Sequence, residues 1–452
     1  MSKIRRSFAV VPAAVAALVL GSVPGFAQSA VSAPRASSAG SAVSADDAPP
    51  LLNRKGEAEG EEEAGFDKLR DAYFWSRLLS GDDSLSVAQA AKLRLRASQQ
   101  ASRIDATDTR GKARGGTWAT QGPNPIVQVV RTSNTFAAMA GRIGALVIRR
   151  NGTIILGAAQ GGVWTYAPGA GVNGTWRSRT RSTDTQAVGA LALAPSNDRI
   201  VYMGSGEGSL SGDSYYGDGI YRSADGGKTW THVSSAFTGQ AVTDIVVDPR
   251  HPNHLFASTV RGRGGAHRTT SPTDRAYGVS RSNDGGRTWT LLKGTKDELH
   301  GATDLVMDPQ HPDVLWASFW GDGIYRSTDS GRTWKSALGD LPEGNFVEGG
   351  TRFSLGLSHP ADARTATVYA GFDYFDAQDT YHPAQIWKTT SNGTTWTLAT
   401  GSTTGADSPT DYCGTQCFYD NEVKPDPDDP NTVYALGSYG YDDSPQSGGV
   451  YR

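Results

Sequence analysis

Six carboxylate side chains stand close to aromatic residues in segments that we expect to be loops. The carboxylates are Glu207, Asp213, Asp218, Asp322, Asp373 and Asp376, and the aromatic residues are Tyr215, Tyr216, Trp320 and Tyr374. Aromatic rings beside carboxylates suit sugars, which present C–H faces as well as hydroxyl groups. Two carboxylates ~5–5.5 Å or ~6.5–9.5 Å apart can also cleave a glycosidic bond. These residues predict a polysaccharide or glycan ligand; turn hydrogen bonding and packing between strands are their alternative roles.

Other site chemistries find little support in the sequence. His251, His311 and His359 each precede a proline in a repeated turn, which assigns them to the scaffold. Because no clustered metal-ligand or Ser-His-Asp pattern appears, we expect no metal site and no cofactor. The formal net charge of −3 argues against a nucleic-acid partner. The only cysteines, Cys413 and Cys417, favour a local disulfide over two free thiols.

A short repeated motif indicates the elements that position these residues. The motif, here called the box, reads Ser-x-Asp-x-Gly-x-Thr-Trp and occurs around Asp225, Asp284 and Asp329, while a fourth copy carries Ser391 in place of the aspartate. The carboxylate can accept backbone N–H groups in a tight turn, the glycine allows an unusual backbone angle, and the tryptophan can pack between sheets. We therefore expect the three aspartates to be structural.

The box belongs to a longer repeat that begins near residue 116. Each box follows a β-like segment such as Gly323-Ile-Tyr-Arg-Ser, and two strand-like segments joined by a turn lie further upstream. This repetition predicts an all-β fold, a β-propeller of four-stranded blades, with six blades visible and the last one incomplete. Loops between second and third strands should then share one face around the channel entrance, and these loops contain the candidate carboxylates.

The segments before residue 116 have a different character. Residues 1–30 show a basic start, an apolar stretch and small residues, which is the order of a cleavable export signal. Residues 31–65 are expected to be a disordered linker, residues 66–115 a helical pro-segment or strut, and residues 116–452 the propeller. We expect a secreted, extracellular protein without a membrane span.

The boxes resemble those of the Asp-box (BNR) repeat superfamily, which includes sialidases, xyloglucan-cleaving glucanases and sortilin-type receptors. Gly141-Arg-Ile-Gly, Gly161-Gly-Val-Trp and Gly204-Ser-Gly-Glu-Gly look most similar to the xyloglucanase-like and sortilin-like branch. The resemblance implies a glycan-binding propeller with glycoside hydrolase activity, or a sortilin-like scaffold that binds protein or peptide without catalysis.

The resemblance does not extend to the catalytic residues. The family's catalytic Asp before the Gly-Gly-x-aromatic strand is replaced here by Ala159-Gln160, and no sialidase arginine triad can be assembled. Whether the chain is an enzyme therefore stays open. Relatives with more blades also imply that the chain is a fragment.

Overall fold

The computed structural model describes residues 141–168, 175–180, 183, 185–209, 214–262, 276–296, 300–344, 351–378, 380–399, 412–413, 417–437 and 449–451. The expected export signal, linker and helical segment lie outside the described residues, as does Asp213. Within the described residues, no helix is long and apolar enough to cross a bilayer.

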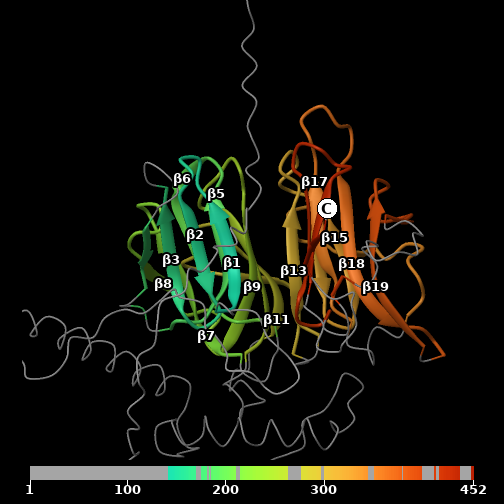
Figure 1. Cartoon of the computed structure of the whole chain (residues 1–452), viewed down its shortest axis with the longest axis horizontal. Helices are drawn as coiled ribbons and strands as arrows, with labels where there is room; N and C mark the ends of the chain where they lie inside the picture. Colours follow the sequence, from blue (N-terminus) through green and yellow to red (C-terminus); the bar gives the residue numbers. More distant parts are fainter. Residues whose placement is uncertain are drawn as a thin grey trace, which may run out of the picture. The chain divides into compact units, whose positions relative to one another are not determined.

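The described strands form six antiparallel sheets, five with four strands and one with three (Figure 1). Sheet 1 contains β1 (Ile143–Ile148), β2 (Ile154–Ala158), β3 (Gly162–Ala167) and β4 (Thr175–Ser178). Sheet 2 contains β5 (Val188–Ala194), β6 (Asn197–Gly206), β7 (Tyr216–Ser223) and β8 (Thr231–Ser234). Sheet 3 contains β9 (Gln240–Val247), β10 (Leu255–Arg261), β11 (Tyr277–Ser282) and β12 (Thr290–Thr295).

The remaining sheets repeat the same order. Sheet 4 contains β13 (Ala302–Met307), β14 (Leu315–Phe319), β15 (Gly323–Ser327) and β16 (Lys335–Ser336). Sheet 5 contains β17 (Ser354–Ser358), β18 (Thr367–Phe375), β19 (Tyr381–Thr389) and β20 (Thr397–Leu398). Sheet 6 contains β21 (Asn421–Pro425), β22 (Val433–Gly437) and β23 (Gly449–Tyr451). In each sheet, neighbours in sequence pair, and first strands of consecutive sheets contact one another. This arrangement confirms the predicted propeller blades.

Because consecutive strands of each sheet run antiparallel, the turns that connect them alternate between two faces of the molecule. We call the face with the first-to-second and third-to-fourth strand turns the box face, and the opposite one the loop face. At the box face the two turns of a sheet are joined, because Gly226 N–H donates to Arg199 O at 2.8 Å and Gly285 N–H to Asn253 O at 2.9 Å. Ser330 N–H donates likewise to Asp313 O. Backbone hydrogen bonds thus hold the two turns of a sheet together on one face.

The four boxes have equivalent backbone conformations. The residue after the box aspartate or its serine replacement has a positive φ in every copy: 79° at Gly226, 75° at Gly285, 59° at Ser330 and 60° at Asn392. This left-handed conformation favours glycine and asparagine and is costly for most other residues. The sequences of the box turns therefore agree with the turn geometry that they adopt.

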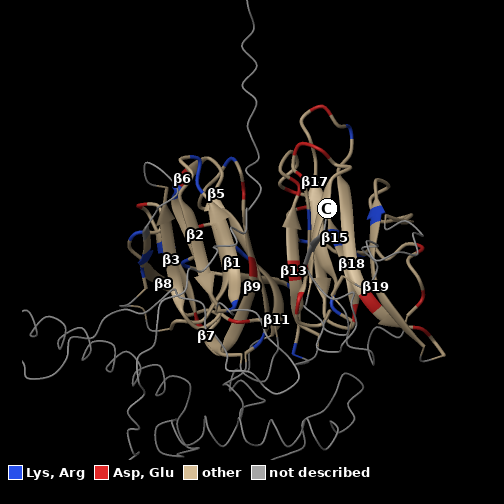
Figure 2. Ribbon diagram, in the orientation of Figure 1, with Lys and Arg blue, Asp and Glu red and all other residues tan. Residues whose placement is uncertain are grey.

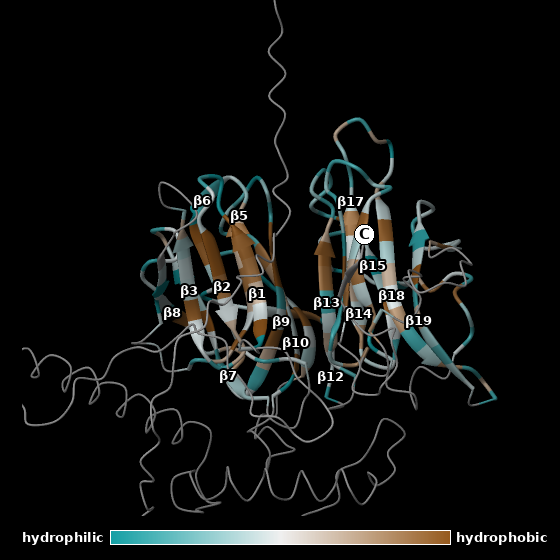
Figure 3. Ribbon diagram, viewed as in Figure 1, coloured by the Kyte–Doolittle hydropathy of each residue, from teal (hydrophilic) through white to brown (hydrophobic). Residues whose placement is uncertain are grey.

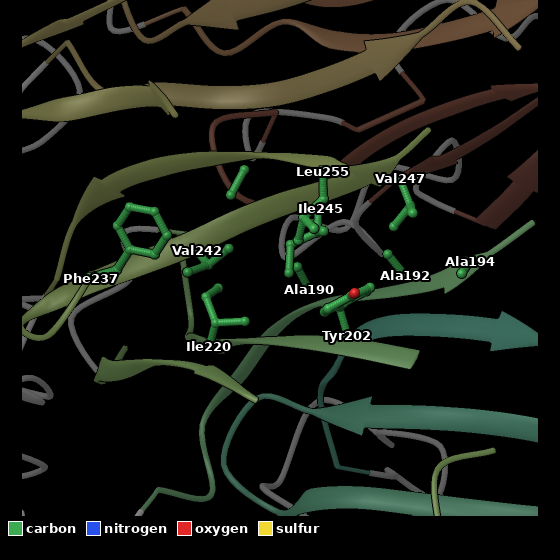
Figure 4. Packing of buried hydrophobic residues seen from close by; sticks show 11 residues of the cluster. Ala190, Ala192, Ala194, Tyr202, Ile220, Phe237, Val242, Ile245, Val247 and Leu255 are labelled. Carbon is green, nitrogen blue, oxygen red and sulfur yellow. The ribbon is translucent and has the colours of Figure 1, made fainter. Parts of the chain in front are cut away.

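Apolar residues of facing sheets form the core, and five clusters fill the five seams between consecutive sheets. Figure 4 shows the seam of sheets 2 and 3, where Ile220 and Val242 meet. The box tryptophans take part in this packing: Trp230, Trp289 and Trp334 contact the seam before their own sheet, and Trp396 is 4% exposed. In Figure 3, apolar residues accordingly concentrate on first strands such as β5 and β13.

Candidate functional site

A small pocket opens on the loop face at the seam between sheets 3 and 4. Its volume is ≈ 260 Å³, and we call it the seam pocket. Its described lining consists of Lys293, Gly294, Thr295, His300, Phe319 and Asp322. Phe319 is 2% exposed and lies behind the pocket, with Lys293 Nζ 4.9 Å from its ring centroid, whereas Lys293, His300 and Asp322 supply polar groups. The sequence-predicted Asp322 therefore lies in a pocket, and Trp320 is half-buried beside it in the same loop.

A β-bulge in β12 brings Lys293 to this pocket. Val279 pairs with Lys293 and Ser280 with Leu291, so Leu292 is the extra residue. Bulges re-aim neighbouring side chains. Here Leu292 packs into the apolar seam of sheets 3 and 4, and Lys293 reaches the same neighbouring sheet. Its Nζ lies 3.7 Å from the ring centroid of Tyr325, a cation–π contact.

The charges around the seam pocket are coupled. The Tyr325 hydroxyl donates to Asp322 Oδ1 at 3.0 Å, and burial together with the Asp322 charge raises the pKa of Tyr325 to about 12. Burial lowers the pKa of Lys293, and the negative charge of Asp322 opposes this shift. The exposed Asp322 carboxylate has further lone pairs available, so the pocket presents an ammonium donor and a carboxylate acceptor to a ligand.

A second group on the loop face connects residues far apart in sequence. Glu207, whose side chain is 3% exposed, accepts a hydrogen bond from Arg142 Nη2 at 3.0 Å. The Arg142 guanidinium lies over the Tyr419 ring, 5.4 Å from its centroid, and also donates to the Tyr419 hydroxyl. We call these three residues the rim cluster. It joins the start of β1, the end of β6 and the segment before β21.

A third charged group lies along the first strands. Asp244 on β9, Asp304 on β13, and Glu422 and Lys424 on β21 influence one another electrostatically, and we call them the axial cluster. Burial raises the pKa of both Asp244 and Asp304, while the three carboxylates raise the pKa of Lys424 against its own desolvation. The Lys424 side chain is nevertheless 48% exposed, so this cluster is open to solvent at Lys424. Figure 2 shows acidic bands within β9 and β13.

Three other sequence-predicted carboxylates are held by hydrogen bonds within their own sheets. The expected loop position is wrong for two of them, because Asp218 lies in β7 and Asp373 in β18. Asp218 accepts from Ser205 Oγ at 3.0 Å and from the Tyr221 hydroxyl at 2.5 Å. Asp373 is fully buried and accepts from the Tyr381 hydroxyl at 3.2 Å. Asp376 accepts from the His382 ring nitrogen at 3.0 Å, and this bond is the main reason why its pKa is lowered to about 2.

The tyrosines predicted to contact a ligand also lie in different parts of the molecule. Tyr215 and Tyr216 are half-buried next to the rim cluster, where Glu207 N–H donates to Tyr215 O at 2.8 Å. Tyr374 is 6% exposed and stacks on His382 with ring centroids 4.5 Å apart. The five described carboxylate candidates therefore occupy separate environments, each with its own partners.

Sequence reasoning missed the axial cluster and Lys293. A signal for the first was present, because Thr-Asp-Ile-Val and Thr-Asp-Leu-Val place Asp244 and Asp304 at the same position of two otherwise apolar first strands. A carboxylate in a buried strand is unusual enough to attract attention. Lys293 gave no such signal, since its position depends on the bulge at Leu292.

Comparison with known proteins gives likenesses in structure. No family model and no curated protein matches the chain. It is similar to a GH74 enzyme from Niastella koreensis (21% identity, 66% of this chain and 41% of that chain, TM-score 0.44). It is similar to a GH74 xyloglucanase from Xanthomonas campestris (15% identity, 67% of this chain and 42% of that chain, TM-score 0.48). It is also similar to YCF48 bound to D1 peptide (10% identity, 58% of this chain and 65% of that chain, TM-score 0.32). The chain thus spans less than half of either GH74 protein, and these likenesses concern the β-propeller fold.

Proposed function

We propose that this chain is an exported propeller that binds a polysaccharide or other glycan at its loop face, with the seam pocket as the primary contact. The observation that carries the proposal is that Lys293 and Asp322 line one pocket, with Lys293 Nζ held 4.9 Å from the ring centroid of the buried Phe319. An ammonium group and a carboxylate can satisfy neighbouring sugar hydroxyls as donor and acceptor. The volume of ≈ 260 Å³ suits a small ring rather than a large ligand.

Binding rather than cleavage is the proposed activity of the seam pocket. Glycosidases of the common type need two carboxyl groups flanking the bond. Among the described residues that line this pocket, Asp322 is the only carboxylate. The disulfide between Cys413 and Cys417 supports the export part of the proposal, because such bonds persist in oxidising compartments.

The test is a binding panel on the full chain. Calorimetric titration with xyloglucan, other β-glucans and sialosides should identify at least one ligand, and a reducing-end assay on the same mixtures should stay at background. Asp322→Ala should weaken that ligand by about tenfold or more, since a hydrogen bond to a charged group contributes ~1.5–3 kcal/mol. Lys293→Met should weaken it similarly.

Asp313→Asn is the matched control, because Asp313 is exposed on the box face of the same sheet. It should leave the affinity unchanged. Absence of binding across the panel refutes the glycan proposal, and binding that survives both pocket substitutions refutes the location. Release of reducing ends would instead establish hydrolase activity. Binding of an extended peptide library without any glycan binding would support the receptor-like alternative.

A further inference from the structure

One group of metal-ligating side chains lies on the box face, far from the pocket residues just described. Asp308 and His311 belong to the turn between β13 and β14, and His359 belongs to the turn between β17 and β18. Their ligating atoms, one from each residue, all lie within 4.8 Å of one another. The group therefore spans the seam between sheets 4 and 5.

The contacts within the group are close and partly protected from solvent. His359 Nδ1 lies 2.8 Å from both carboxylate oxygens of Asp308, and His311 Nδ1 lies 3.3 Å from Asp308 Oδ2. The side chains of Asp308 and His359 are 5% and 2% exposed, whereas that of His311 is 58% exposed. Asp308 and His359 are thus held in place by the fold, and His311 lies between them and solvent.

The surrounding structure fixes the position of these ligands. Gln310 Nε2 donates to the backbone oxygens of His359 and Pro360, so a residue of the first turn holds the second turn. The N–H of His311 and that of Gln310 donate to Asp308 Oδ1. Partners of this kind orient metal ligands and limit the entropy lost on binding.

We propose that Asp308, His311 and His359 form a binding site for a divalent transition metal ion, with Zn²⁺ as the best match. Two imidazoles and one carboxylate are a ligand set that Zn²⁺ accepts, with the fourth position left to water. Without metal, His359 Nδ1–H donates to the Asp308 carboxylate, which can only accept; on binding, the ion takes the place of this proton and the neutral ring carries its proton on Nε2 instead. The ion would connect sheet 4 to sheet 5, which gives the site a stabilising role independent of any glycan.

The preceding sheet offers an internal comparison. Asp248, His251 and His254 form a similar group, with His251 Nδ1 3.2 Å from Asp248 Oδ2. Both of these histidines are exposed, and all three residues come from a single turn. We therefore expect this group to bind metal more weakly than the group that contains His359.

The experiment is a Zn²⁺ titration of the full, untagged chain after treatment with a chelator that is then removed. Calorimetry should show one tighter site, and Zn²⁺ should raise the midpoint of thermal unfolding. His311→Asn should weaken the tighter site by at least ~10-fold, because a loss of that order follows even when a partner of a ligand is removed. His311 is exposed, so the variant should fold normally.

His251→Asn is the matched control and should leave the tighter site unchanged. An unchanged affinity in His311→Asn, or the absence of Zn²⁺ binding by the wild-type chain, overturns the proposal. Loss of the tighter site in His251→Asn but not in His311→Asn would also overturn it, since the ion would then be bound by the other group.

Discussion

Substitution of a box aspartate tests the physical basis of the fold, and Asp225 is the best position for it. Its carboxylate accepts four hydrogen bonds: from the Ser223 hydroxyl at 2.8 Å, from Lys228 N–H and Thr229 N–H at 3.0 Å, and from the Thr229 hydroxyl at 2.7 Å. Because the turn is largely exposed, water can replace some of these bonds. We therefore assign ~0.5 kcal/mol to each, the low end of the usual range, and expect Asp225→Ala to cost about 2 kcal/mol.

The fourth box, which has Ser391 in place of the aspartate, predicts the effect of a serine substitution at Asp225. Ser391 Oγ accepts from Thr395 N–H at 2.9 Å and lies 2.7 Å from the Thr395 hydroxyl, which retains about half of the bonds that an aspartate makes. Asp225→Ser should therefore cost about 1 kcal/mol. For a body of this size, a loss of 2 kcal/mol corresponds to a fall of roughly 3 °C in the unfolding midpoint.

The stabilisation by Asp225 should depend on pH in a defined direction. Burial opposes ionisation of Asp225, but the hydrogen bonds from Thr229, Ser223 and Lys228 outweigh it and lower the pKa to about 2. The stabilisation is therefore complete above the ordinary value of 3.8 and is lost as the pH falls towards 2. Thermal unfolding of the wild type, both variants and the exposed control Asp362→Ala should be followed from pH 7 to pH 2. Equal midpoints of Asp225→Ala and the wild type at pH 7, or a difference that persists at pH 2, would refute the reasoning.

Two further predictions concern the axial cluster and the disulfide. Burial and the charge of Asp304 raise the pKa of Asp244, so its stabilising contribution is complete below 3.8 and is lost as the pH rises towards the raised value. Asp244→Asn should therefore match the wild type in midpoint near pH 4 and exceed it near pH 8, and parallel curves would contradict this. Cys413→Ser with Cys417→Ser should lower stability by about 2 kcal/mol at the short loop length, measured by urea unfolding against the oxidised wild type. A reductant added to the wild type should cause the same loss, and a reduced wild type that keeps its stability would show that the loss in the variant has another cause.

The fold could be predicted because its determinants are local. Each box contains within a few residues the acceptor, the left-handed position and the tryptophan that its turn requires, so the sequence shows the whole turn. The site is harder to predict, because a carboxylate that is expected in a loop can instead lie in a strand, as Asp218 does in β7, and accept hydrogen bonds from partners that the sequence does not indicate. Asp218 is bound to Ser205 and Tyr221, whereas Asp322 lies in a pocket formed with a lysine from another sheet.

The histidine turns illustrate the same limit. Asp308 and His311 belong to one turn, and the sequence assigns that turn to the scaffold. His359 joins them only because the turns of sheets 4 and 5 lie side by side at the box face. A pattern that is read within one repeat cannot reveal a ligand set that two repeats share. The same holds for the rim cluster, where Arg142 and Tyr419 come from opposite ends of the described chain.

The distribution of β-bulges offers an independent reason to place a ligand site at the loop face. Between first and second strands, register shifts occur near this face in sheets 1 to 4, while a further shift in sheet 2, at Leu193 and Ala194, lies at the box face. Bulges are enriched beside active sites because they re-aim side chains at the cost of regular pairing. In β9 and β13 the shifts immediately precede Asp244 and Asp304, and the shift in β12 presents Lys293. The regular box turns stabilise each sheet, so irregular pairing is tolerated at the opposite end, which carries the pocket proposed to bind glycan.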